Sequence, residues 1–377
     1  MEDKYSAANF LFAHTENARG CLWHKDRNTM KRALVCGAGG FIGSHLVARL
    51  KLEGYWVRGV DLKEPEYDQS EADQFLKADL RNAAMCSEIC DMPFSEVYQL
   101  ADDAGGAGHI FTKQHDADIM HNSVIVNCNM LKSAVNSGVG KIFFSSSACI
   151  YPEQNPFAPL NPSGAEDSAY PSLPDSEYGW EKLFSERLYL SYQRNYEIRV
   201  RIARLHNVFG PGVSWNNGRE NALAALCRKV AESPAGGEIE VWGNGSQTRS
   251  FLYIEECLEG VRRLMDSEFS DPLNIGSEEI ISIDQLAYAI MRIAKKDLRI
   301  RHAPGPVGVA GRKPDNRRIR EKLGWSPDLP LSYGLEKTYA WIREQVVSDK
   351  RNALVFEKER ESAKIRRKLA DENASVL

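Results

Sequence analysis

The sequence lacks long apolar runs and any strong excess of charge. Its 377 residues carry a net charge of −4, which argues against binding to nucleic acid or to an anionic membrane surface. No segment approaches the roughly eighteen apolar residues that a membrane-spanning helix needs. The N-terminal residues lack the basic start and the apolar centre of a signal peptide. We therefore expect a cytoplasmic protein without nucleic-acid or membrane partners.

The eight cysteines form no zinc-binding pattern. No C-x-x-C pair occurs, and Cys86 and Cys90 have no matching second pair. The sequence therefore predicts no metal site, and it predicts free thiols in a reducing compartment.

Strand-like and helix-like segments alternate through the first two hundred residues. Such alternation predicts a Rossmann-type, doubly wound parallel α/β sheet, followed by a smaller C-terminal α/β substrate lobe interleaved with it. We expect four parts, namely an N-terminal extension (1–30), a dinucleotide-binding domain (31–210), the substrate lobe (211–348) and a charged tail (349–377).

A glycine motif follows the first predicted strand. Gly37, Gly40 and Gly43 have the spacing G-x-x-G-x-x-G, and the next residues open a helix. Glycines there permit a tight turn and close approach of a pyrophosphate to the helix N-terminus. Asp61 ends the second strand, where a carboxylate binds ribose hydroxyls and favours NAD over NADP. The cofactor candidates are Gly37, Gly40, Phe41, Ile42, Gly43, Asp61 and Asp79, although Asp79 is equally suited to capping a helix.

Tyr178 and Lys182 are spaced i and i+4 on a predicted helix, so they share one face. A lysine cation lowers the pKa of a neighbouring phenol, which can then take a proton from a substrate alcohol while hydride leaves for NAD. Ser147, at a strand end, supplies a hydrogen bond to the same oxygen. Tyr178 and Lys182 also contribute to cofactor binding in this prediction.

Several longer motifs resemble the extended short-chain dehydrogenases/reductases and, within them, the GDP-mannose 3,5-epimerase family. They include GAGGFIGSH (37–45), SSSACIYPE (145–153), YGWEKL (178–183), WGNGSQTRSF (242–251) and GRKPDN (311–316). The resemblance implies an NAD-dependent isomerase that oxidises C4 of a GDP-sugar, exchanges protons at C3 and C5, and then reduces C4 again. It also implies a homodimer, joined by the helices at 117–137 and at Tyr178.

The same resemblance implies that Cys149 is one of two acid/base groups. A thiol near Lys182 and the nicotinamide charge is expected to have a depressed pKa. The family's second group is a lysine after Gly-Arg-Glu, but Asn221 follows Gly218-Arg219-Glu220 here. An amide cannot donate a proton as an acid. Glu220, Lys229 or water could substitute, only one centre could be inverted, or the reaction could differ.

The remaining motif matches imply substrate contacts. With Ser147 and Cys149 they comprise Gly106, Asn207, Glu220, Asn221, Lys229, Gln247, Arg249 and Arg312, and His109 is expected near the hexose. Two arginines and a lysine suit a diphosphate. A 4-epimerase on a related nucleotide sugar and a non-enzymatic NAD-binding regulator remain alternatives. A 4,6-dehydratase is disfavoured because Ala148 and Cys149 provide no carboxylate.

Overall fold

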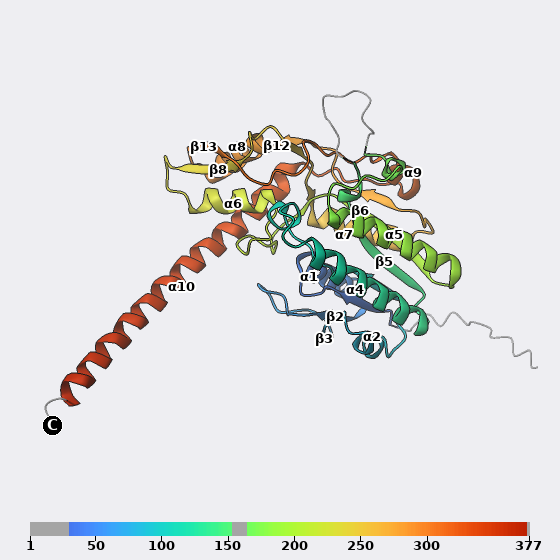
Figure 1. The fold of residues 1–377 in the computed structure, drawn as a ribbon, viewed down its shortest axis with the longest axis horizontal. Helices are drawn as coiled ribbons and strands as arrows, with labels where there is room; N and C mark the ends of the chain where they lie inside the picture. Colours follow the sequence, from blue (N-terminus) through green and yellow to red (C-terminus); the bar gives the residue numbers. More distant parts are fainter. Residues whose placement is uncertain (1–29, 153–163, 375–377) are drawn as a thin grey trace, which may run out of the picture. The chain divides into compact units, whose positions relative to one another are not determined.

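A seven-stranded sheet organises the protein (Figure 1). The computed structural model describes residues 30–152 and 164–374, so most of the predicted N-terminal extension lies outside the described residues. The strand order is β11-β6-β5-β4-β1-β2-β3, and every pair is parallel. The strands are β1 (Arg32–Cys36), β2 (Trp56–Asp61), β3 (Gln74–Lys77), β4 (Glu96–Gln99), β5 (Lys141–Ser147), β6 (Arg199–Leu205) and β11 (Leu273–Ile275). The predicted parallel α/β sheet is confirmed.

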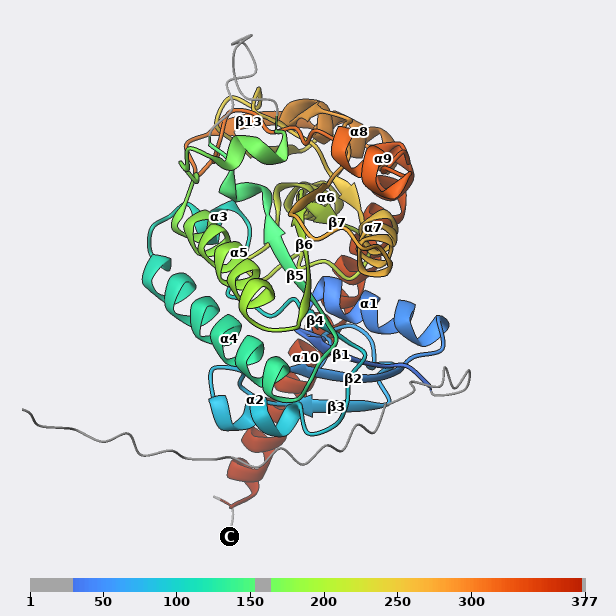
Figure 2. The ribbon, with the colours of Figure 1, turned by 90° about the vertical axis from the view of Figure 1, so that its right-hand side faces the viewer.

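Helices cover both faces of this sheet, as parallel strands require (Figure 2). On one face lie α2 (Ala83–Ile89), α4 (Asp116–Asn136) and α5 (Glu177–Asn195). On the other lie α1 (Phe41–Leu52) and α7 (Ile254–Asp266), while α6 (Ala222–Glu232), α8 (Ile283–Ala294) and α10 (Leu331–Ala374) pack on one another in the C-terminal half. Shorter helical segments are α3 (Ala107–Ile110), α9 (Arg317–Leu323), η1 (Ala148–Ile150) and η2 (Glu166–Ala169).

The core follows these two layers. Successive strand residues point to opposite faces, so Val35 packs with α1 while Leu34 packs with α2 and α4. The strands are apolar on both sides, with Leu34, Val35, Val97 and Ile142 fully buried. Continuous apolar strands are typical of a sheet covered on both faces.

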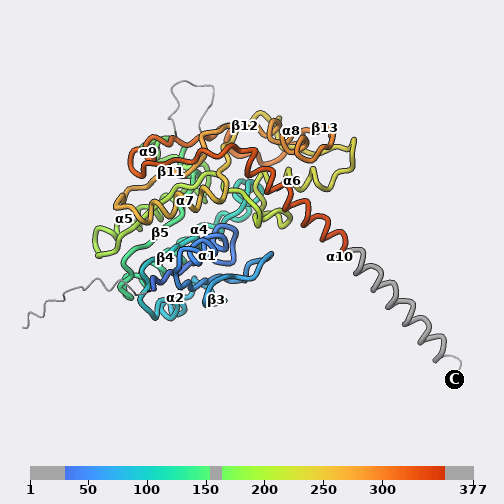
Figure 3. Tube along the Cα trace, turned by 180° about the vertical axis from the view of Figure 1, so that it is seen from behind, coloured from blue at the N-terminus to red at the C-terminus, as the bar shows by residue number. Residues whose placement is uncertain are grey.

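Three small two-stranded sheets build the C-terminal half. They pair β7 (Val208–Phe209) with β10 (Leu252–Tyr253), β9 (Thr248–Arg249) with β12 (Ile281–Ser282), and β8 (Glu238–Trp242) with β13 (Arg299–Ala303). Figure 3 shows α6, α8, β12 and β13 gathered on one side of the molecule, away from β2 and β3. Because β11 returns to the large sheet beside β6, the two halves share one sheet.

The last helix extends into the predicted charged tail (349–377). α10 begins at Leu331 and remains helical to Ala374. Its buried side chains Leu331, Leu335, Tyr339, Ile342 and Val346 recur every three or four residues and pack into the core. No described helix combines the length and apolar character needed to cross a membrane.

A buried ion pair fixes α5 against the sheet. Arg204 on β6 binds Glu186 on α5 with its Nη2 2.7 Å from Oε2, and both side chains are almost fully buried. Ser146 on β5 also donates to Glu186, at 2.5 Å. Strands β5 and β6 therefore hold the helix that carries Tyr178 and Lys182. Removing one partner of such a pair typically costs several kcal/mol.

Gly43 allows α1 to begin directly beside the end of β1. A Cβ atom at this position would lie 1.9 Å from the Gly37 carbonyl oxygen. We predict that Gly43→Ala lowers the free energy of unfolding by about 1–3 kcal/mol or more, with loss of NAD binding. Thermal unfolding and NAD titration measure both effects. Gly140→Ala is the control, because its Cβ would meet nothing closer than 3.5 Å. Equal free energies of unfolding of the two variants would contradict the role of Gly43 in the close contact between α1 and the end of β1.

Candidate active site

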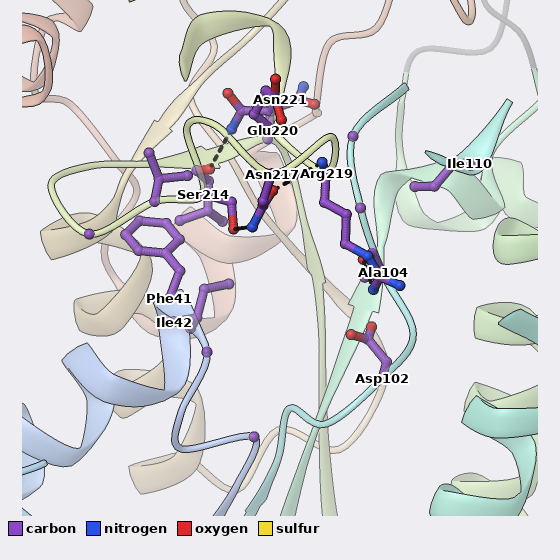
Figure 4. Close-up of a pocket in the computed structure, with 18 of the residues that line it drawn as sticks. Phe41, Ile42, Asp102, Ala104, Ile110, Ser214, Asn217, Arg219, Glu220 and Asn221 are labelled. Carbon is purple, nitrogen blue, oxygen red and sulfur yellow. Dashed lines mark hydrogen bonds between the residues drawn. The ribbon is translucent and has the colours of Figure 1, made fainter. Parts of the chain in front are cut away.

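One large pocket lies along the carboxyl ends of the parallel strands. Its volume is about 1600 Å³, and it extends from the Gly37 turn to Trp242 and Arg249. The chain runs from β1 outward to β2 and β3, whereas β4, β5 and β6 extend the other way. Such a change of direction leaves a crevice at the strand ends, where α/β sheets bind ligands. Figure 4 shows part of its lining, with Phe41 and Ile42 below the loop that carries Arg219 to Asn221.

The glycine turn fits a dinucleotide. Gly37 adopts a φ of +83°, a conformation that favours glycine, and its Cβ would lie 2.8 Å from the Ala101 amide nitrogen. No side chain caps the N-terminus of α1 at Gly40, so the first amides of the helix face the pocket unobstructed. Backbone amides and the positive end of a helix dipole suit a pyrophosphate. All five predicted residues from Gly37 to Gly43 line the pocket.

Both predicted carboxylates of the cofactor end line the pocket. Asp61 ends β2, and its Oδ2 accepts a 3.0 Å hydrogen bond from the Gly39 amide, which ties the glycine turn to β2. Asp79 forms an ion pair with Arg81 at 2.7 Å, and this pairing lowers the pKa of Asp79. The alternative that Asp79 caps a helix is wrong, because Asn82 caps α2.

Tyr178, Ser147 and Cys149 meet at one point of the pocket. The Ser147 hydroxyl oxygen accepts a 3.1 Å hydrogen bond from the Cys149 backbone amide, and Ser147 favours the ionised forms of both the Tyr178 phenol and the Cys149 thiol. Gly179 makes this meeting possible, because a Cβ there would lie 2.2 Å from the Cys149 carbonyl oxygen. The first turn of α5 therefore packs directly on η1, and the redox tyrosine is brought next to the thiol.

Lys182 lies behind Tyr178 and is almost fully buried. Its ammonium is 5.4 Å from the centre of the Tyr178 ring and donates to the Ser145 carbonyl at 3.1 Å. It also forms a 2.6 Å ion pair with Asp102, on the loop after β4. Burial opposes the charged form of Lys182, but Asp102 and Glu181 outweigh it and raise its pKa.

The expected lowering of the Tyr178 pKa is wrong for this arrangement. Burial raises the pKa of Tyr178 well above its usual range, and the Asp102 carboxylate adds to the effect. Asp102 lies between the lysine cation and the phenol, with its Oδ2 3.4 Å from the Tyr178 hydroxyl. The sequence pattern contained the lysine but not the carboxylate that compensates its charge.

The expected depressed pKa of Cys149 is also wrong. Burial raises the pKa of the thiol, and Asp175 raises it further, whereas Arg312 opposes both. Arg312 donates to the Cys149 sulfur at 3.4 Å and pairs with the buried Asp175. Cys149 is therefore protonated near neutral pH and is suited to donating a proton.

Asn221 has a structural task. Its Oδ1 accepts from the Ala224 amide at 3.0 Å, which caps α6, and its amide nitrogen donates to the Val208 carbonyl at 3.2 Å (Figure 4). The neighbouring Glu220 forms an ion pair with Arg228 at 3.3 Å through Oε1. The buried Oε2 of Glu220 has no hydrogen-bond partner among the described residues.

The other predicted substrate residues line the same pocket, namely Gly106, Asn207, Lys229, Gln247, Arg249 and Arg312. Gly106 lets the loop after β4 contact the backbone of Glu220, where a Cβ would approach the carbonyl oxygen to 2.0 Å. The Lys229 ammonium donates to the Glu240 carbonyl at 2.8 Å and lies 5.6 Å from the Trp242 ring. His109 is buried, 3.4 Å from Asp103 and stacked on His115.

Sequence reasoning missed two charged groups of the loop after β4. Asp102 contacts the redox pair, and Asp103 binds Arg219 at 3.0 Å. Both follow a strand end at the carboxyl edge of the sheet, and this position could have indicated them.

Comparison with known proteins agrees with a dinucleotide-binding redox site. Residues 33–276 match the NAD dependent epimerase/dehydratase family. The chain belongs to this family. The match extends from β1 to the residue after β11, so it contains the glycine turn, Cys149 and the redox pair. The protein is therefore an enzyme of the epimerase family with NAD as its cofactor.

Curated relatives include GDP-mannose 3,5-epimerase of Arabidopsis thaliana, 43% identical over 318 residues, which are 84% of this chain and 83% of that protein. GDP-mannose 3,5-epimerase 1 of Oryza sativa subsp. indica is 41% identical over 92% of this chain and 90% of its own length. The resemblance read from the motifs is thereby confirmed.

Among solved structures, UDP-glucose 4-epimerase from Thermotoga maritima, with UDP-glucose, has a TM-score of 0.73 at 25% identity. The match covers 84% of this chain and 99% of that one. UDP-glucose 4-epimerase from Thermus thermophilus, in complex with NAD, has a TM-score of 0.72 at 21% identity over 83% and 99%. Both share the fold of this epimerase-family enzyme.

The capping role of Asn221 predicts a measurable loss of stability. Asn221→Ala removes the side-chain acceptor at the start of α6 and should lower the free energy of unfolding by about 1 kcal/mol. Asn221→Ser retains a capping acceptor without setting a carboxylate against the Val208 carbonyl, so it should be more stable than Asn221→Ala. Denaturant unfolding compares the three proteins. An unchanged stability of Asn221→Ala would contradict the cap.

Proposed function

We propose that this enzyme is a GDP-mannose 3,5-epimerase or a close functional relative, with a GDP-linked hexose as substrate. The observation that carries the proposal is the position of the Cys149 thiol beside the redox tyrosine, because Gly179 packs on the Cys149 carbonyl and the Cys149 amide donates to Ser147 Oγ at 3.1 Å. A plain dehydrogenase needs the tyrosine, lysine and serine alone. The additional Cys149 thiol beside these residues is suited to transferring a proton to or from a carbon atom of the substrate.

The redox step is what makes the carbon centres acidic. A sugar C–H next to an alcohol carbon does not release a proton, whereas a C–H next to a ketone gives an enolate that hydrogen-bond donors stabilise. Oxidation at C4 activates C3 and C5 together, since both flank it. When bound, the nicotinamide cofactor supplies the acceptor and the later donor of the hydride.

The residues of the chain then handle the protons. Tyr178 takes the proton of the C4 hydroxyl during oxidation and returns it during reduction, while Ser147 hydrogen-bonds the same region of the substrate. Cys149 transfers a proton at a carbon beside the ketone. Because its thiol is protonated near neutral pH, it acts first as the acid.

The GDP moiety binds at the far end of the pocket. Lys229 and Arg249 supply cations to the pocket wall, and Gln247 donates to the Trp242 carbonyl at 2.9 Å beside them. Guanidinium and ammonium groups suit a diphosphate. Burial lowers the pKa of Lys229, and a phosphate group would favour its charged form.

Glu220 is the group that we assign as the second acid/base. Asn221 is engaged in the cap of α6, and it has no acidic proton. The ammonium of Lys229 is held by the Glu240 carbonyl. Glu220 lines the pocket and has one buried carboxylate oxygen without a partner among the described residues.

Inversion of a single centre is the second candidate function. The position expected to carry a lysine instead carries an amide that is hydrogen-bonded to backbone on both sides. If Glu220 does not transfer protons, a water molecule would take the proton from carbon on one face of the ring and Cys149 would donate on the other, which inverts one centre.

Solvent exchange tests these assignments. The enzyme is incubated with GDP-mannose in deuterated water, and exchange at each carbon is followed by NMR. We predict deuterium at both C3 and C5 with the parent protein. Cys149→Ala should abolish exchange at one or both centres by removing the thiol, while reduction of bound NAD remains detectable. Cys149→Ser is the matched control for shape, with a far weaker acid.

Each result has a separate meaning. Loss of exchange at one centre in Glu220→Gln supports Glu220 as the second group, and full exchange in that variant contradicts it. Deuterium at one centre in the parent protein supports single inversion. Inversion at C4 without exchange identifies a 4-epimerase. Normal exchange by Cys149→Ala overturns the role of the thiol.

We also propose a homodimer joined by α4 and α5. Trp180 and Phe184 lie one turn apart on α5 and are 40% and 48% exposed. Large apolar side chains gathered on one exposed face are typical of protein interfaces. A cytoplasmic location is proposed as well, and the free state of the seven cysteines among the described residues supports it.

The interface predicts the behaviour of one variant. Phe184→Glu places a charge on the proposed contact and should convert the dimer to a monomer. Light scattering after gel filtration measures the mass directly. Tyr288→Glu on α8 is the control, since Tyr288 is 54% exposed away from α4 and α5. A monomeric parent protein, or a dimeric Phe184→Glu, would contradict the proposed contact.

A further inference from the structure

The Asp102 carboxylate lies in the redox centre but has no part in the proton transfers described above. Its Oδ2 is 2.6 Å from the Lys182 ammonium and 3.4 Å from the Tyr178 hydroxyl. The side chain of Asp102 is 15% exposed and that of Lys182 is 2% exposed, so water screens their interaction weakly. Figure 4 shows Asp102 at the pocket, on the loop that carries Ala104.

The contacts of Lys182 explain what this carboxylate does locally. The ammonium has two acceptors, the Asp102 carboxylate and the Ser145 carbonyl at 3.1 Å. These two partners fix it 5.4 Å from the centre of the Tyr178 ring. A flexible lysine side chain has several rotatable bonds, so two fixed acceptors decide where its charge is placed.

Glu181 is a second carboxylate near the pair, and it also raises the pKa values of Lys182 and Tyr178. Glu181, on α5, accepts hydrogen bonds from Ser185 at 2.6 Å and from Asn127 at 3.1 Å. Arg312, beside Cys149, pairs with Asp175. Among the described residues, Asp102 is the carboxylate for which contacts to both Tyr178 and Lys182 are found.

The tyrosine of an epimerase must transfer a proton in both directions within one catalytic cycle, whereas that of a one-way dehydrogenase transfers it in one direction. Within the proposed function, on which this inference rests, Tyr178 accepts a proton during oxidation and returns it during reduction in every cycle. While the substrate is a ketone, such a tyrosine must hold a proton that it can return to the C4 oxygen. An uncompensated lysine cation would favour the phenolate alone.

We propose that Asp102 is a positioning residue of the redox centre, which fixes the Lys182 ammonium and counterbalances its charge beside the Tyr178 hydroxyl. The tyrosine thereby keeps the proton that it takes during oxidation until it returns it during reduction. The raised pKa of Tyr178, due to burial first and Asp102 second, agrees with this arrangement.

The ionisation of Tyr178 tests the proposal without any sugar substrate. Tyrosinate absorbance is titrated in the full-length parent protein and in Asp102→Asn, each corrected by the matching protein that also carries Tyr178→Phe. Asp102→Asn removes the carboxylate that contacts both groups and leaves Glu181 as the remaining carboxylate near Lys182, so Tyr178 should ionise at a pH lower by about one unit. Asp102→Glu keeps the charge and should remain closer to the parent.

Asp103→Asn is the matched control. Asp103 is the next residue on the same loop, but its carboxylate binds Arg219 and Asn122 and not Lys182. The Tyr178 titration should therefore be unchanged in this variant. If Asp102→Asn does not fold, Asp102→Ser removes the same charge and takes its place. The proposal is overturned if Tyr178 ionises at the same pH in the parent and in the variants that lack Asp102. It is also overturned if Asp103→Asn shifts the ionisation of Tyr178 equally.

The pH profile of the reaction gives a second reading. In Asp102→Asn, the pH at which kcat/KM for exchange falls on the acid side should decrease together with the pKa of Tyr178. If Asp102 had only a structural role, its removal would lower kcat/KM at every pH without changing that midpoint. A parent protein that turns over no GDP-sugar would refute the proposed function. The Tyr178 titration would still test Asp102, so the two failures are distinguishable.

Discussion

The parallel pairing of seven strands is the constraint on which the rest of this structure depends. Parallel strands require crossover helices, and these helices bury both faces of the sheet. The carboxyl ends of the strands then share one edge. The glycine turn after β1, the acidic loop after β4 and the serine run at the end of β5 all lie at this edge. Residues separated by more than a hundred positions can therefore form one site.

Close backbone contacts give this site its geometry. At Gly43, Gly106 and Gly179 a Cβ atom would approach a carbonyl oxygen to 1.9, 2.0 and 2.2 Å. Each glycine lies where a helix or loop packs directly on another segment. The first contact forms the cofactor turn, the second joins the loop after β4 to the loop before α6, and the third places Tyr178 beside Cys149. Glycines at these backbone contacts thus determine how far apart the side chains of the site lie.

Burial changes the chemistry of those groups more than residue type suggests. The phenol of Tyr178 and the thiol of Cys149 both have raised pKa values because they are removed from water and face carboxylates. Asp102 precedes Tyr178 in the chain, whereas Asp175 follows Cys149. The spacing of Tyr178 and Lys182 correctly predicted that both lie at one point of the site. The pKa of Tyr178, however, depends on charged groups from other elements, such as Asp102.

The sequence by itself determined the parallel α/β fold, the glycine turn for a dinucleotide and the membership of an epimerase family. These properties depend on local patterns, because apolar periodicity and glycine spacing act over a few residues. It also located the residues that line the pocket, since their motifs are contiguous. Only the tertiary structure decided that Asn221 caps α6, that Arg312 contacts the Cys149 sulfur, and that Asp102 compensates Lys182. Those interactions join side chains from separate elements, and electrostatic energies depend on distance and burial that no linear pattern contains.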